Sequence, residues 1–197
     1  MATLKPFRQI SENDVVNLYA FDGSSATRGH IVKLSATAAK GWQADDELDT
    51  VGVSDQSYGN TKSDRYSVKA RVETCTSGDV PFGMLMYDVA ETDENGEKLI
   101  FHPRKAHEMQ VALSGQAVPV LTRGIVLVNG ITEFGSETVQ AGVTVYAGDD
   151  GAIITQTAAS VQNLKKVGVA LGSAVGASSE YGQSGDVLIK LNCDLDR

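Results

Sequence analysis

The chain has 197 residues, and its 17 Lys and Arg against 25 Asp and Glu give a formal charge of −8. A chain of this length buries roughly 70% of the surface that its unfolded form exposes, which allows one good core or two small ones. The acidic balance argues against a nucleic acid partner, because such binding relies on Lys and Arg to neutralise phosphates. No apolar run approaches the ~20 residues that span a bilayer, so we also expect no membrane partner.

Residues 1–25 have the character of an N-terminal arm. Leu4, Phe7 and Ile10 are spaced along a polar segment that Pro6 interrupts, and this segment lacks the apolar core of a signal peptide. Two alternatives remain open: the three apolar residues anchor the arm on another protein, or the segment packs on its own domain. Ser11 is placed to cap a short helix that follows it.

Residues 26–113 are expected to form a β-rich region. Residues 67–74 alternate apolar and charged side chains, which puts Val68, Ala70 and Val72 on one face of a half-buried strand. The pair Asn95-Gly96 lies between the apolar runs 84–89 and 99–101 and predicts a β-hairpin.

The same turn resembles the start of a calcium loop, through Asp93, Asn95 and Gly96. The acidic ligand expected later in such a loop is replaced by Arg104, so the pattern favours a plain turn.

Residues 114–197 are expected to form a compact C-terminal β-module. Short β-branched runs alternate here with Gly, Asp and Asn, which is the pattern of strands joined by tight turns. Val169 is expected to be buried in the strand at residues 167–171, so an Asp in its place should unfold the module. The runs cover residues 120–128, 141–146, 151–155, 167–171 and 185–191.

The sequence offers little catalytic chemistry. His30, His102 and His107 are the candidate bases at neutral pH, and no Gly-x-Ser-x-Gly elbow accompanies them. His107-Glu108 begins like a zinc-protease helix, but Val111 stands where the second histidine belongs. The sequence therefore predicts no catalytic residue, no cofactor and no metal.

Other isolated features also favour structural explanations. Cys75 and Cys193 are too few and too far apart for a disulfide framework or a zinc site, and indicate free thiols of a protein made in a reducing cytoplasm. Trp42 is expected to lie half-buried beneath a loop. The acidic cluster Asp45, Asp46, Glu47 and Asp49 is expected to be a solvated loop.

The order of the C-terminal motifs resembles that of the decoration, or cement, proteins that stud tailed-phage capsids. The resemblance rests on Thr122-Arg123-Gly124 before an apolar run, and on a turn and hairpin from Ala141 to Gly151. It continues through the strand Val167-Gly168-Val169-Ala170-Leu171 to a closing strand that ends at Leu191. The positions that match are expected to set turns and core packing: Gly124, Gly142, Tyr146, Gly151, Gly168 and Leu191.

The resemblance implies a mainly β protein made of β-barrel or β-sandwich-like modules, with an extended N-terminal arm and at most short helices. It implies a non-enzymatic virion protein, assembled in the host cytoplasm, that binds the outer surface of the capsid. Its partners would be the major capsid protein and two further copies of itself in a trimer. Leu4, Phe7 and Ile10 would then be the capsid-binding residues of the arm.

Two other functions remain open at this stage. The first is a structural component of the phage tail or neck. The second, from a different class, is a small β-barrel hydrolase or a sugar-binding module, which two carboxylates and aromatic side chains in one cleft would favour. The chain also has about a hundred residues before the recognisable module, which puts a simple one-domain mode of attachment in doubt.

Overall fold

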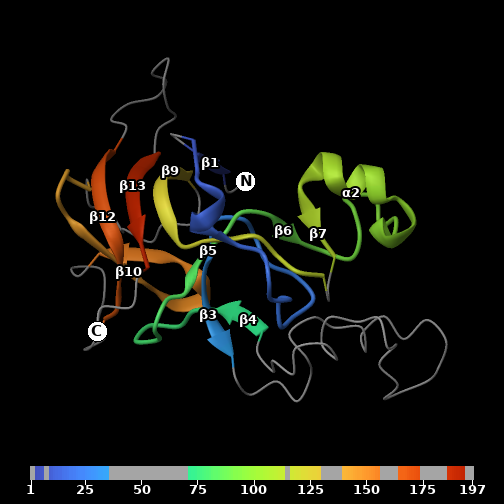
Figure 1. Ribbon diagram of the computed structural model, residues 1–197, viewed down its shortest axis with the longest axis horizontal. Helices are drawn as coiled ribbons and strands as arrows, with labels where there is room; N and C mark the ends of the chain where they lie inside the picture. The colour runs from blue at the N-terminus through green and yellow to red at the C-terminus, as the bar shows by residue number, and fades with distance from the viewer. Residues whose placement is uncertain are drawn as a thin grey trace.

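The computed structural model describes residues 3–6, 9–35, 71–113, 116–129, 139–155, 164–173 and 186–193 (Figure 1). The chain is mainly β, as predicted, with two large antiparallel sheets and one short parallel pair in this part of the chain. Both large sheets run from one edge strand to another, so neither closes into a barrel as described. Of the two forms in the predicted fold class, barrel and sandwich, the two large sheets match the sandwich.

The strands of the six-stranded sheet come from both ends of the sequence. In spatial order they are β1 (Thr3–Pro6), β9 (Arg123–Asn129), β13 (Val187–Asn192), β12 (Lys166–Ser173), β10 (Thr144–Ala147) and β11 (Ile153–Thr155).

The five-stranded sheet is built mainly from the first half of the chain. Its order is β2 (Val15–Val16), β8 (Val120–Leu121), β5 (Gly83–Leu85), β3 (Ile31–Ser35) and β4 (Arg71–Thr74). Beside it, β6 (Asp88–Val89) pairs in parallel with β7 (Val111–Ala112). The described helices are η1 (Glu12–Asp14), η2 (Leu99–Phe101), α2 (Pro103–Met109) and η3 (Asp149–Gly151).

The main core lies between the two large sheets. Successive side chains of a strand point to opposite faces, so β3, β5 and β8 of the five-stranded sheet each divide their residues between two clusters. Ile31, Met84 and Leu121 face the main core, where they join residues of the six-stranded sheet such as Val126 and Ile189. Their sequence neighbours Val32, Leu85 and Val120 belong to the second cluster. The inner strands β8, β5 and β3 therefore contribute buried side chains on both faces of the sheet.

The expected single run at residues 120–128 is two strands in two different sheets. The chain passes from β8 to β9 at Thr122, whose N–H and Oγ1 donate to the Asp14 carbonyl at 2.8 and 3.0 Å. The Thr122 carbonyl accepts from the Cys193 N–H at 3.0 Å. A Cβ at Gly124 would come within 3.3 Å of the Leu121 side chain. This corner joins the two sheets, and its partners come from distant parts of the chain.

The N-terminal region contributes to both sheets. Thr3–Pro6 pairs with β9 in the register Thr3 to Asn129, and Val15–Val16 pairs with β8. Ser11 caps η1 as predicted, accepting from the Asn13 N–H at 3.4 Å. The helix ends after one turn because the β-branched pair Val15-Val16 continues as strand. Both sheets therefore combine strands from either side of the domain boundary expected near residue 25. Strand β8, which follows the boundary expected near residue 113, belongs to the same sheet as strands that precede it.

The strand expected at residues 67–74 is described from Arg71 onward, and Val68 and Ala70 lie outside the described residues. Val72 is buried, as its pattern predicts, but the neighbouring Arg71 is buried as well. The alternation placed Arg71 on a solvent face, which is wrong. Residues 20–22 pair alongside β4 through a parallel bridge between Phe21 and Val72, and the Arg71 guanidinium lies 3.7 Å from the Asp22 carboxylate.

The turn at Asn95-Gly96 is present, but the predicted hairpin is wrong. Gly96 has a φ of 82°, and the Asp93 carboxylate accepts from the N–H groups of Asn95 and Glu97 at 2.9 and 2.7 Å. A single bridge joins Thr92 to Lys98, after which the chain forms η2 instead of a strand. The strand before the turn, β6, takes its partner from β7 beyond α2.

The C-terminal runs form the predicted strands β9, β10, β11, β12 and β13. In β13 buried and more exposed residues alternate, as expected for a strand with one face on a core. In β12 the buried residues are Val167, Gly168 and Ala170, whereas Val169 is half-buried. Val169 lies across from the exposed Lys190, so its expected place in the core is wrong.

Candidate interaction surface

Residues 98–110, which we call the η2–α2 corner, turn the chain through two short helices at one end of the molecule (Figure 1). Pro103 occupies the first turn of α2, where its fixed φ suits a helix and its missing N–H is not needed. The helix ends at Gln110, whose φ of 56° is left-handed and whose N–H donates to the carbonyl groups of Ala106 and His107. The corner is thus a defined structure rather than an extension of the preceding turn.

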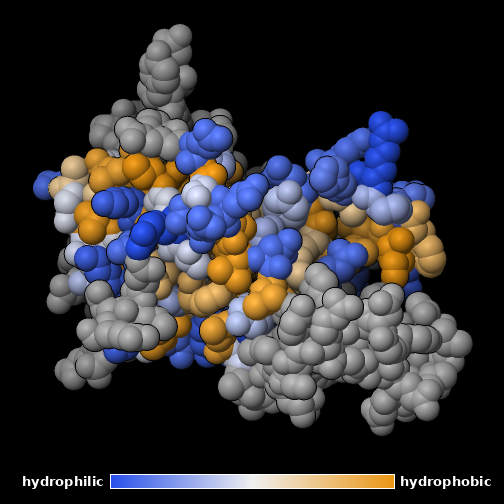
Figure 2. All heavy atoms as spheres, viewed as in Figure 1, coloured by the Kyte–Doolittle hydropathy of each residue, from blue (hydrophilic) through white to orange (hydrophobic). Residues whose placement is uncertain are grey.

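The corner carries two large apolar side chains on its surface. Leu99 is fully buried and fixes η2, whereas Ile100 is 41% exposed and Phe101 is 74% exposed. Figure 2 shows apolar and strongly hydrophilic side chains next to each other at this end of the molecule. Exposed aromatic and aliphatic residues that lie together are characteristic of protein contact surfaces.

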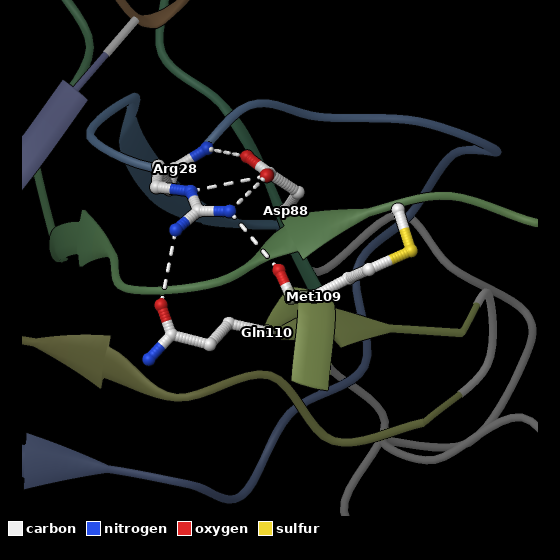
Figure 3. Close-up of polar contacts among 4 residues, drawn as sticks. All are labelled: Arg28, Asp88, Met109 and Gln110. Atoms are coloured by element: carbon white, nitrogen blue, oxygen red, sulfur yellow. Dashed lines mark hydrogen bonds and ion pairs between the residues drawn. The ribbon is translucent and has the colours of Figure 1, made fainter. Parts of the chain in front are cut away.

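A polar cluster holds the end of α2 against the rest of the fold (Figure 3). The Asp88 carboxylate accepts from Arg28 three times, from its backbone N–H at 2.7 Å, its Nε at 3.0 Å and its Nη2 at 2.6 Å. Arg28 also donates to the Gln110 side chain at 3.0 Å and to the Met109 carbonyl at 3.1 Å. One guanidinium therefore joins the turn before β3, the strand β6 and the C-terminus of α2.

A second polar cluster holds the start of the corner. Lys105 in α2 donates to the carboxylate of Asp93 and, at 3.2 Å, to that of Glu97. The Asp93 side chain has no exposed surface, and the hydrogen bond from Lys105 lowers the pKa of its carboxyl group. Because both ends of the corner are tied down, Ile100 and Phe101 are displayed on a pre-formed surface.

The residues predicted to form a capsid-binding arm lie partly in the fold itself. Leu4 in β1 and Ile10 are partly buried and pack against the main core. Phe7 lies outside the described residues. Of the two alternatives for this segment, packing on its own domain describes Leu4 and Ile10, and contact of the segment with a partner remains a prediction.

Of the six scaffold positions, the four glycines fall at turns and close approaches, and the other two lie in strands. Gly142 and Gly151 have φ values of 91° and 76°, and Gly124 faces Leu121 at the corner between the sheets. A Cβ at Gly168 would overlap the Lys190 carbonyl oxygen of the neighbouring strand. Leu191 is fully buried in the main core, and Tyr146 is half-buried in β10 next to a register shift.

The histidines and cysteines occupy separate environments. His102 and His107 are exposed on the η2–α2 corner, while the Nδ1 atom of His30 is buried. Burial raises the pKa of Cys75 and of Cys193 to about 12, so both thiols stay protonated at neutral pH. Within the described ranges, no three His, Cys, Asp or Glu side chains are grouped as metal ligands would be.

Comparisons with protein families, with curated proteins and with solved structures found no match to this chain. No helix in the described part of the chain has both the length and the apolar character needed to cross a membrane. Trp42 and the acidic residues 45–49 lie outside the described residues.

Sequence reasoning missed the residues that make the η2–α2 corner. Pro103 after an exposed apolar pair was a local signal for the start of a helix, but residues 99–101 were interpreted as the second strand of a hairpin. The role of Arg28 had no signal in the sequence, because Asp88 and Gln110 are 60 and 82 positions away.

Proposed function

We propose that this protein is a non-enzymatic virion protein that binds the outer surface of a tailed-phage capsid as a trimer and stabilises contacts between capsid subunits. The observation that carries the proposal is that the segments which resemble decoration proteins form one structural unit. They become β9, β10, β12 and β13, which all belong to the six-stranded sheet and contribute to the same core.

The state of the polar side chains supports a structural role over a catalytic one. The ionised side chains of Arg28, Asp88, Lys105 and Asp93 bind one another and backbone groups. The edge-to-face pair of Tyr19 and Phe82, with ring centroids 5.8 Å apart, packs against the second core cluster instead of forming a platform for a sugar.

The N-terminal strand is the surface that we assign to the capsid. Strand β1 is an edge of the six-stranded sheet, and an edge strand offers backbone groups to which a partner's extended segment can pair. Many copies bound to a repeated shell would hold firmly even if each contact were weak, because linked contacts raise avidity.

The test is a cryo-electron microscopy reconstruction of the virion that contains this protein. We expect density for the two-sheet body on the capsid exterior at three-fold or quasi-three-fold positions, with β1 facing the shell. Density confined to the tail or neck would instead support a tail component, and absence from the particle would refute a virion role.

A further inference from the structure

The sequence contains two Asn-Gly pairs, Asn95-Gly96 and Asn129-Gly130. Asparagine is one of the chemically labile residues of proteins, because its side-chain amide can react with the next residue of the chain. The attack comes from the backbone nitrogen of that next residue, and glycine leaves this nitrogen unshielded because it has no Cβ. The two pairs therefore have the same intrinsic reactivity, and the fold decides which of them reacts.

The fold allows the Asn95 side chain to reach the nitrogen of Gly96. Asn95 is exposed in a turn, and its side-chain amide makes no hydrogen bond to the residues that the structure describes. A Cβ at Gly96 would meet no atom within 4 Å, so the space beside the attacking nitrogen is open. One contact opposes the reaction. The Gly96 N–H donates to the Asp93 carbonyl at 3.1 Å, and the nitrogen must lose this proton before it attacks.

The fold holds the other asparagine in place. Asn129 is the last residue of β9, where it is half-buried and pairs with Thr3 of β1. Its side-chain nitrogen Nδ2 donates to the carboxylate of Asp186 at 2.7 Å. A hydrogen bond to an ionised group is stronger than one between neutral groups, so this amide must give up a strong contact before it can be attacked.

We propose that Asn95 is a site of spontaneous deamidation in the folded protein and that the fold protects Asn129. The Gly96 nitrogen forms a bond to Cγ of Asn95, the bond from Cγ to the side-chain nitrogen breaks, and ammonia leaves with the proton of the attacking nitrogen. Water then opens the resulting five-membered imide at one of its two carbonyl groups. The product at position 95 is an aspartate or an isoaspartate, each with one new negative charge. The reaction needs no enzyme and no co-reactant besides water, so it does not depend on the proposed function.

The new charge enters a segment that is already acidic. Asp93, Glu94 and Glu97 surround position 95 in the sequence, and Lys105 pairs with two of them, Asp93 and Glu97. A further carboxylate adds repulsion between like charges, which solvent and salt screen because position 95 is exposed. The charge alone should therefore have a small effect on the η2–α2 corner.

The isoaspartate product also changes the backbone. Its chain runs through the former side-chain carbons, so the path between residues 95 and 96 gains one methylene group. Two hydrogen bonds of the turn span this point, from the Gly96 N–H to the Asp93 carbonyl at 3.1 Å and from the Glu97 N–H to the Asp93 carboxylate at 2.7 Å. A longer path displaces these donors, and the same Asp93 carboxylate binds Lys105 of α2. Isoaspartate formation should therefore loosen the start of the η2–α2 corner, which displays the exposed apolar pair.

The experiment incubates the purified full-length chain in mildly alkaline buffer and follows both asparagines over time by peptide mass spectrometry. Trypsin places them in different peptides, because Lys98 and Arg123 lie between them. We expect residue 95 to convert about tenfold or more faster than Asn129, since the contact with Asp186 adds to the barrier at Asn129. In enough urea to unfold the chain, the two rates should become similar.

A second measurement tests the effect on the corner. The isoaspartate form is separated from unreacted protein by ion-exchange chromatography, and hydrogen exchange in residues 99–109 is measured for both. We expect faster exchange in the isoaspartate form. Asn95→Asp is the matched control: it adds the same charge without lengthening the backbone, so its exchange should stay close to that of the wild type.

Equal rates at the two positions in the folded protein, or a faster rate at Asn129, would overturn the assignment of the site. The same holds for a folded chain in which residue 95 stays unchanged while the chain in urea reacts, because the contact with Asp93 would then protect the turn. An isoaspartate form that exchanges like unreacted protein would overturn the predicted loosening of the η2–α2 corner.

Discussion

Gly168 lies in β12 beside the backbone of β13, and the absence of a side chain there has a direct structural reason. A Cβ at this position would overlap the Lys190 carbonyl oxygen, which belongs to backbone and cannot rotate away. We predict that Gly168→Ala destabilises the protein by about 2 kcal/mol, because the two strands must separate to accept the methyl group. Urea unfolding of the variant and the wild type measures this difference.

Gly96→Asn is the control for the Gly168 prediction. Gly96 also has no side chain, but its surroundings within 4 Å are open and its φ is 82°, a conformation that Asn tolerates. We expect this variant to unfold close to the wild type. Equal losses at Gly96 and Gly168 would show that the close approach of the strands is not what requires glycine.

At this scale, the residues whose environment is set by near neighbours were the predictable ones. Ser11 caps η1 because the N–H that it binds is two residues away, and the turn at Asn95-Gly96 depends on its own backbone. Arg71 was misplaced because its burial depends on residues 20–22, which approach from outside the pattern of its strand.

Among the elements, α2 depends most on contacts from distant segments. We predict that Arg28→Lys loosens the C-terminus of α2 and costs about 1 to 2 kcal/mol of stability, because an ammonium cannot reproduce the planar set of hydrogen bonds to Asp88, Met109 and Gln110. Hydrogen exchange measured by mass spectrometry should show faster exchange in residues 106–112.

Arg104→Lys provides the comparison for the Arg28 prediction. It makes the same chemical change, but within α2 itself, where Arg104 is 93% exposed and its pair with Glu108 contributes little. Exchange in α2 should then match the wild type. If both variants exchange alike, the Arg28 cluster does not hold the helix.

Two substitutions in β12 test which of its side chains face the core. Val167 is fully buried in the main core, so Val167→Asp places a charge without a partner in an apolar site and should cost several kcal/mol or prevent folding. Val169→Asp should cost much less, because Val169 is half-buried and lies across from the exposed Lys190. Thermal melting of the two variants compares the positions, and a larger loss at Val169 would contradict the observed facing of β12.

The elements also show why the strands were easier to predict than their partners. β10, β12 and β13 each carry a short apolar run bounded by turn residues, so their existence was predictable from local sequence. The pairing of β6 with β7 was not, because the intervening η2 and α2 had been interpreted as part of a hairpin. The η2–α2 corner, as a candidate site, was missed for the same reason.

In the whole molecule, the two sheets are joined through segments that the sequence divides among three regions. Ile31, Cys75 and Met84 from the first half of the chain pack in one core with residues of β9, β12 and β13. The alternating residues of β3, β5 and β8 supply two clusters at once, which no single strand pattern indicates. Disruption of either sheet should therefore affect the stability of the other.

Protonation of His30, the residue before β3, makes the stability of the molecule depend on pH. Burial lowers the pKa of His30 from its ordinary 6.5, although the nearby Asp150 and Asp88 oppose the shift. The unfolded chain therefore binds a proton at a higher pH than the folded one, so this contribution favours the folded state least at low pH. We predict that the His30 contribution to the free energy of unfolding is complete above pH 6.5. It is lost as the pH falls from 6.5 through the folded pKa of His30.

Protonation of Asp79 produces a second, separate decrease in the free energy of unfolding at lower pH. Burial acts to raise the pKa of its carboxyl group, but hydrogen bonds from Lys33 and Thr76 outweigh it and bring the pKa down from 3.8 to about 2. A carboxylate with a lowered pKa contributes stability above its unfolded pKa and loses it as protons bind, here between pH 3.8 and about 2. Urea unfolding across the two ranges measures both steps. His30→Gln should remove the upper step and keep the lower one, and Asp79→Asn should do the reverse; an upper step that survives His30→Gln would assign that step to another group.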